Sequence, residues 1–129
     1  MSETRALPIA GRSVILPEVI EVRSPYDDRL LGAVPACTAA EVDEAVAAAK
    51  AALATPIPAH ERARILDAVA DALEKRAEEF AQTICGEAAK PIRTARIEVA
   101  RAVETFRFAA VEARSLTGEV VPMDAHPAG

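Results

Sequence analysis

The stretch EAAKPIRTARIEVARAVETFRFAAVEARSLTG, residues 87–118, decides how this chain folds. Pro91 suits the first turn of a helix, because its fixed φ matches the helix and its missing N–H is not needed there. Gly118 can close the same helix, because glycine adopts the left-handed conformation without steric cost. Between them, about six turns of good helix formers contain no glycine or proline. These features predict a long helix over residues 91–117.

Apolar side chains recur along this helix at steps of three and four residues, which predicts one buried stripe. Glu98 stands three residues before Arg101, and this spacing allows a local ion pair. Glu104 and Arg107 repeat the same spacing, so we expect these charges to lie on a solvated face. The predicted stripe comprises Ile97, Ala100, Val103, Phe106 and Ala110, with Val99 and Phe108 at its flanks.

The sequence before this helix predicts a hairpin and three shorter helices. Two β-prone runs flank the turn-forming residues 24–28 and predict an antiparallel pair. Thr38 and Glu41 have the spacing of a capping box at the start of a helix. Residues 1–17 mix proline, glycine and polar residues without periodicity, which predicts a flexible arm. The predicted elements are a hairpin over about residues 19–34, helices over about residues 39–53, 59–75 and 77–88, and an extended tail over residues 119–129 after the long helix.

The composition predicts a chain that is mostly α, with an N-terminal β-hairpin and few large core side chains. Half of its 129 residues are hydrophobic, but only three phenylalanines, one tyrosine and no tryptophan are present. Alanine supplies much of the apolar fraction, and it lets helices approach closely while removing little apolar area from water. We therefore expect the chain to form part of something larger.

Charge and hydropathy exclude several classes of protein. A net charge of −5 with no basic run argues against nucleic-acid binding. No apolar run approaches the roughly 20 residues that a membrane span requires. The N-terminus has no charged start followed by an apolar segment, so a secretory signal is not supported. The expectation is a cytoplasmic protein that binds neither nucleic acid nor membrane.

The residues alone supply no catalytic or cofactor-binding motif. The five glycines stand at positions 11, 32, 86, 118 and 129, so the sequence has neither a GxGxxG turn nor a Walker-type loop. Cys37 and Cys85 are too few and too far apart to predict a disulfide scaffold or a zinc site. Cys85 falls on the apolar side of a predicted helix, which favours a buried structural thiol over a nucleophile.

Seven short motifs follow one another in a fixed order. They are VRSP at 22–25, LGAV at 31–34, EVDEAV at 41–46, ERA at 61–63, KP at 90–91, EV at 98–99 and GE at 118–119. Together they resemble the N-terminal portion of the aldehyde dehydrogenase superfamily, over roughly residues 20–124. The resemblance implies that residues 18–129 are an incomplete N-terminal segment of that α/β fold, flanking its Rossmann-like cofactor domain.

The run ARIEVARA at residues 95–102, with Thr105 and Phe106, is most similar to one branch of that superfamily. This branch contains lactaldehyde, phosphonoacetaldehyde and non-phosphorylating glyceraldehyde-phosphate dehydrogenases. In some of these enzymes an arginine at the position of Arg101 helps to hold an anionic substrate, and a guanidinium suits a phosphate or carboxylate. The alternative is that Arg101 is an ordinary surface arginine.

The resemblance also leads to expectations for two further positions. Glu87 matches an acidic residue that lies at a structural monovalent-cation site beside the hairpin in some relatives. Ala89 stands where the family usually has glycine before the KP motif. If that position requires a positive φ, alanine strains the turn.

The resemblance also implies what the chain lacks. In the family the catalytic cysteine, the general-base glutamate and the cofactor-binding loop lie beyond the point at which this chain ends. The full-length enzyme oxidises an aldehyde to a carboxylic acid with NAD or NADP, and this chain alone is expected to bind no cofactor and to be catalytically incomplete. Its partner would be the remainder of the dehydrogenase, or a second copy bound through exposed apolar helix faces. The alternative is a non-enzymatic helical interaction module.

Overall fold

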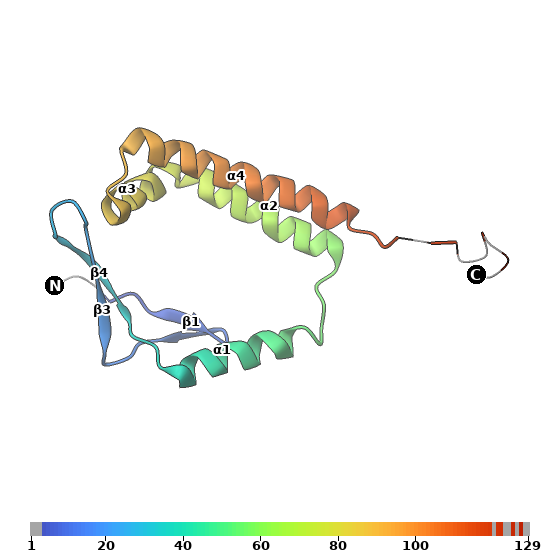
Figure 1. Ribbon diagram of the computed structural model, residues 1–129, viewed down its shortest axis with the longest axis horizontal. Helices are drawn as coiled ribbons and strands as arrows, with labels where there is room; N and C mark the ends of the chain where they lie inside the picture. Colours follow the sequence, from blue (N-terminus) through green and yellow to red (C-terminus); the bar gives the residue numbers. More distant parts are fainter. Residues whose placement is uncertain (1–3, 120, 123–124, 126, 128–129) are drawn as a thin grey trace.

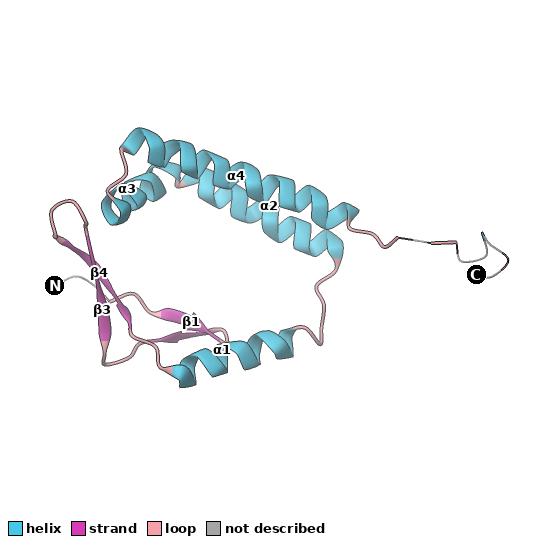
Figure 2. Ribbon diagram, viewed as in Figure 1, coloured by secondary structure: helices cyan, strands magenta, loops and turns pink. Residues whose placement is uncertain are grey.

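The computed structural model describes residues 4–119, 121–122, 125 and 127. Helices make up most of the described chain and two antiparallel strand pairs precede them, which confirms the predicted fold class (Figures 1 and 2). The elements are β1 (Leu7–Ile9), β2 (Arg12–Val14), β3 (Val19–Arg23), β4 (Leu30–Pro35), α1 (Ala39–Ala52), α2 (Ala59–Lys75), α3 (Ala77–Ala88) and α4 (Ile92–Ser115).

The predicted hairpin is formed by β3 and β4. Val19 lies opposite Pro35, and the register shifts between Val22 and Arg23. The turn depends on Ser24, which is buried and whose carbonyl accepts a hydrogen bond of 2.9 Å from the N–H of Asp28. Asp28 itself has a φ of 58°, a conformation that aspartate tolerates better than most residues. The turn chemistry seen in the sequence therefore forms as expected.

The range 1–17, expected to be a flexible arm, instead contains a second hairpin. Strands β1 and β2 pair antiparallel around Ala10 and Gly11, whose φ angles are 50° and 77°. Positive φ at both central residues is the geometry of a two-residue type I′ turn. Nothing in the sequence indicated this hairpin, because asparagine or aspartate usually precedes the glycine in such a turn and alanine carries no signal. The flexibility of the arm stays a prediction.

Helices α2 and α4 form the main packed unit and run side by side (Figure 1). Their contact is built from small side chains, because Ala63, Ala70 and Ala110 are each 0% exposed and Val103 is 4% exposed. Alanine brings two helix backbones close together, so these positions have little room for a larger side chain. At the rim, Arg107 binds Glu74 and Arg114 binds Asp67, and these exposed ion pairs link α4 to α2 while contributing little to stability.

The buried face of α4 is only partly the predicted stripe. Val99, Val103 and Ala110 are buried, but Ile97 is 57% exposed and Phe108 is 69% exposed. The helix therefore carries two apolar faces, and the second, with Ile97 and Phe108, is exposed. Periodicity identifies apolar positions, but it does not tell which of two neighbouring faces a partner covers.

Both ends of α4 differ slightly from the prediction. Pro91 is the residue that precedes the first helical position, and the helix begins at Ile92. It ends at Ser115, because Leu116 takes an extended conformation with ψ of 105°. Gly118 does not have a positive φ, so it does not close the helix in the predicted left-handed manner.

The three shorter helices lie close to their predicted ranges. Glu41 accepts a hydrogen bond of 2.7 Å from the backbone N–H of Thr38, and the capping box opens α1 as the spacing predicted. Arg76, with φ of −110°, interrupts the helical conformation between α2 and α3. This break lies between the two predicted helices, over residues 59–75 and 77–88.

The turn between α3 and α4 is strained at Ala89. This residue ends α3 in the left-handed conformation, with φ of 51° and ψ of 28°. A side chain in this conformation costs roughly 1 kcal/mol relative to glycine. The condition under which alanine was expected to strain this turn, a positive φ, is therefore met.

We expect Ala89→Gly to raise the free energy of unfolding by about 1 kcal/mol, because glycine removes the steric cost of the left-handed conformation. Urea unfolding followed by circular dichroism measures the change. The matched control is Ala88→Gly, one residue earlier and still helical, which should lower stability by about 0.5–1 kcal/mol. Equal destabilisation by the two substitutions would contradict the strain at Ala89.

The chain leaves an unusual amount of surface uncovered. Its accessible area is 9988 Å², whereas a compact monomer of 13.6 kDa is expected to expose about 6,600 Å². Helix α1 buries none of its residues, and Val42 and Val46 are about half exposed. In Figure 1, α1 lies on the opposite side of the molecule from α2 and α4. The open shape leaves apolar faces of α1 and α4 without a covering element in the described chain.

Candidate functional site

A shallow groove lies along the uncovered face of α4, and Arg101 stands near its middle. Thr94, Arg101 and Thr105 share this face because steps of three or four residues return to one side of a helix. Phe108 extends the same surface toward the C-terminal end of α4. The groove is lined by Thr94, Ile97, Glu98, Arg101, Ala102 and Thr105.

Arg101 differs from three other arginines of α4 in its partners. Arg96, Arg107 and Arg114 each bind a carboxylate on another helix. No ion pair joins Arg101 to any residue that the structure describes. Two carboxylates lie near Arg101, but Glu98 is paired with Lys90 and Glu104 with Arg107. A guanidinium with no carboxylate bound to it is suited to an anionic ligand.

The predicted ion pair between Glu98 and Arg101 does not form. Glu98 instead accepts a hydrogen bond of 2.6 Å from the ammonium of Lys90. The other predicted pair is present, with Arg107 lying 3.2 Å from Glu104. The Lys90 contact was missed because it spans the turn before α4, where helical spacing rules do not apply. The contact depends on the path of the chain through Ala89 and Pro91.

The corner where α3 meets α4 is held by a hydrogen-bonded carboxylate. Arg96 donates two hydrogen bonds of 2.9 Å to Glu78, and Gln82 donates a third. These donors lower the pKa of Glu78 to about 2. Behind this corner Ala81, Ala95 and Val99 form a small buried cluster. Together these contacts hold the N-terminal half of α4 against α3. They thereby position the groove, which lies on the uncovered face of α4.

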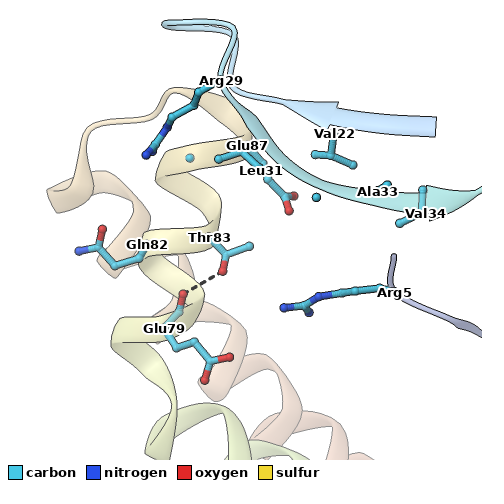
Figure 3. Close-up of a pocket in the computed structure, with 12 residues that line it drawn as sticks. Arg5, Val22, Arg29, Leu31, Ala33, Val34, Glu79, Gln82, Thr83 and Glu87 are labelled. Atoms are coloured by element: carbon cyan, nitrogen blue, oxygen red, sulfur yellow. Dashed lines mark hydrogen bonds between the residues drawn. The ribbon is translucent and has the colours of Figure 1, made fainter. Parts of the chain in front are cut away.

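Glu87 lies in a second hollow, of about 550 Å³, between α3 and β4 (Figure 3). Gly86 lies where α3 comes close to the hairpin, and a Cβ there would be 3.6 Å from the side chain of Leu31, an ordinary van der Waals contact. Glu87 is thus beside the hairpin, where the resemblance placed it. Arg5 and Arg29 line the same hollow, so guanidiniums as well as carboxylates face it (Figure 3).

The described residues contain no cluster of three or more His, Cys, Asp or Glu side chains that could hold a metal ion. Both cysteines are free, and Cys37 is exposed whereas Cys85 is half-buried. The predicted burial of Cys85 is therefore only partial. None of the helices in the described part of the chain has the length and apolarity of a membrane span.

A third surface was not predicted from the sequence, because it depends on β1, a strand that was not expected. Helix α1 packs against β1, and the two form an open apolar groove. Its lining residues are Leu7, Pro8, Ile9, Cys37, Glu41, Val42, Ala45, Val46 and Ala49. The groove is one of the apolar surfaces that the described chain leaves uncovered.

Comparison with known proteins identifies the fold. Residues 14–128 match the family model for the aldehyde dehydrogenase family. The chain belongs to this family. The resemblance found in the order of the sequence motifs is therefore confirmed. Lactaldehyde dehydrogenases are among the aldehyde dehydrogenases that it matches, in agreement with the branch indicated by residues 95–102.

The similarity to individual aldehyde dehydrogenases extends over most of the chain. The chain is 44% identical to the aldehyde-dehydrogenase-like protein y4uC of Sinorhizobium fredii, over 83% of this chain and 21% of that protein. It is 38% identical to the 3-sulfolactaldehyde dehydrogenase of Priestia aryabhattai, over 94% of this chain and 25% of that enzyme. The crystal structure of aldehyde dehydrogenase 21 from Physcomitrella patens superposes with a TM-score of 0.91 at 33% identity, over 98% of this chain and 27% of that one. The chain thus spans about a quarter of the length of the relatives it matches.

Proposed function

We propose that this chain forms the N-terminal part of an NAD- or NADP-dependent aldehyde dehydrogenase and acts only together with the remainder of that fold. The uncovered face of α1 supports this, because an exposed apolar helix face is a surface that the rest of a dehydrogenase would cover. The sequence has no glycine-rich phosphate turn, so we place the cofactor-binding residues in the remainder. A solved relative, PnpE, binds nicotinamide adenine dinucleotide. When bound, such a cofactor would accept the hydride that is released as the aldehyde is oxidised. We propose the cytoplasm as the compartment.

The proposed substrate is an aldehyde that also carries an acid group. The observation that carries this proposal is the guanidinium of Arg101, which lies in the groove on α4 without an ion-pair partner among the described residues. Several relatives are named for aldehydes with an anionic group, namely 3-sulfolactaldehyde, aspartate semialdehyde, malonate semialdehyde and glyceraldehyde 3-phosphate, whereas others are named for lactaldehyde, which carries none. Arg101 would hold that group and so orient the aldehyde.

Glu87 is proposed as a ligand of a structural monovalent cation. Its position beside β4 supports this role, because the backbone of the hairpin lies along the same hollow. Arg5 and Arg29 line that hollow too, and they would compete with a cation for the carboxylates there. A cation would bind only if these guanidiniums turn away or if further oxygen ligands come from the remainder of the fold.

The substrate proposal is tested in a completed enzyme. This is residues 1–129 fused to the part of the Priestia aryabhattai 3-sulfolactaldehyde dehydrogenase that lies beyond the aligned region. In it, we expect Arg101→Met to raise KM for succinate semialdehyde about 10- to 30-fold, because a hydrogen bond between charged groups contributes about 1.5–2 kcal/mol. KM for butanal, which carries no charge, should change less than about twofold. Steady-state kinetics at constant ionic strength supply both values.

The matched control is Arg93→Met, an exposed arginine in the first turns of the same helix that does not line the groove. It should leave both KM values unchanged, since it removes the same charge from a different face. If Arg101→Met affects the two aldehydes equally, or neither, Arg101 does not hold the acid group.

The alternative function is a helical module that associates with a partner or with its own copy through the uncovered apolar faces. The exposed side chains of α1 favour it as much as they favour the dehydrogenase. The two functions differ in activity: the dehydrogenase needs the remainder of the fold, whereas the module does not. Comparison of the chain alone with the completed enzyme separates them.

A further inference from the structure

Lys90 is held in a fixed position at the entrance to α4. It stands between Ala89, whose left-handed φ is 51°, and Pro91, whose φ is −56°. These two residues restrict the backbone on either side of it. From this position its ammonium reaches forward along α4 and lies 2.6 Å from the carboxylate of Glu98. The contact joins residues eight positions apart, so it depends on the shape of the turn.

Without Lys90, Glu98 would be free to pair with Arg101, whereas the other carboxylate beside Arg101, that of Glu104, is paired with Arg107. The two side chains line the same groove and are three residues apart on one helix, a spacing at which opposite charges pair. A carboxylate released beside Arg101 would have two effects. It would compete for the guanidinium, and it would repel an anion that approaches the groove.

We propose that Lys90 is a positioning residue that occupies Glu98 and so leaves Arg101 available to the acid group of the aldehyde. This inference rests on the proposed substrate class. With Lys90 on Glu98, those two charges cancel and the groove retains the single positive charge of Arg101. Without Lys90 the charges of Glu98 and Arg101 cancel each other, and the groove has no net attraction for an anion.

A purely structural role for Lys90 makes a different prediction. In that case the contact with Glu98 only fastens the turn to the first turns of α4, and its loss loosens the helix for every substrate. The side chains of Lys90 and Glu98 are 43% and 48% exposed, so such a fastening contributes little to stability. The difference between charged and neutral aldehydes therefore separates the two roles.

The test uses the completed enzyme with succinate semialdehyde and butanal as probes. We expect Lys90→Met to raise KM for succinate semialdehyde about three- to fivefold, the size of one screened ion pair, with butanal unaffected. Adding Glu98→Gln should return that KM to within about twofold of the parent, because the competing carboxylate is gone. Lys90→Arg keeps the positive charge and should stay close to the parent value.

Each result decides between the two roles. A rise in KM for both aldehydes, or no rescue by Glu98→Gln, overturns the positioning role. If Arg101→Met raises KM for succinate semialdehyde and Lys90→Met does not, the inference fails while the proposed substrate class stands. If Arg101→Met also has no effect, the substrate class fails and Lys90 has no role through Arg101. The double variant, Lys90→Met with Glu98→Gln, removes both members of the ion pair and leaves no unpaired carboxylate. Its KM can therefore still be compared with that of the parent if Lys90→Met alone folds poorly.

Discussion

The 129-residue chain alone is expected to form no NADH or NADPH from any aldehyde, whereas the completed enzyme is expected to turn over. Oxidation of an aldehyde in this family requires a thiolate nucleophile and a site for the nicotinamide. Cys37 is exposed and Cys85 is half-buried on α3, and the sequence offers no glycine-rich turn for a pyrophosphate. Absorbance at 340 nm with a panel of aldehydes and both cofactors measures the difference.

The expected difference is all-or-none, because enzymes accelerate reactions by at least about a millionfold over the uncatalysed rate. The control is the completed enzyme with the catalytic cysteine of its fused part replaced by alanine, which should be as inactive as the chain alone. Cysteine-dependent formation of NADH by the 129-residue chain would refute the proposal that this chain is active only together with the remainder of the fold. An inactive fusion, together with a compact oligomer of the chain alone in sedimentation, would favour the helical module.

The elements predicted correctly are those specified by local signals. The capping box at Thr38 and the break at Arg76 act through the backbone of the residues around them, so the sequence displays them directly. The hairpin of β1 and β2 escaped prediction because its turn uses Ala10 in a left-handed conformation that alanine rarely adopts. The exposure of Ile97 and Phe108 also escaped, because it depends on which face of α4 the described chain covers.

The candidate site was predictable only in part. Arg101 and Glu87 are candidates only through resemblance to a family, since an arginine or a glutamate on a helix has no local signature of function. The structure adds that Arg101 lacks an ion-pair partner among the described residues, while Lys90 takes the carboxylate expected to pair with it. The pairing of Glu98 with Lys90 instead of Arg101 depends on the turn at Ala89, which no periodicity rule describes.

The contact between α2 and α4 is expected to fail when one of its alanines is enlarged. Ala70 is completely buried, and leucine adds three carbon atoms where the helices leave no space. Overpacking of this kind costs about 2–3 kcal/mol. That is a large fraction of the stability of any small domain, and here it acts on a chain whose largest packed unit is this helix pair. Urea unfolding by circular dichroism should show the loss.

The matched control is Ala72→Leu, two residues along the same helix on its exposed side. It adds the same volume without meeting α4, so it should change stability by less than about 0.5 kcal/mol. Because α4 carries Arg101 on the face opposite this contact, Ala70→Leu should also lower the activity of the completed enzyme toward charged and neutral aldehydes alike. Equal effects of the two leucines on unfolding would show that the alanine contact does not hold α4 in place, and the groove around Arg101 would then need another support.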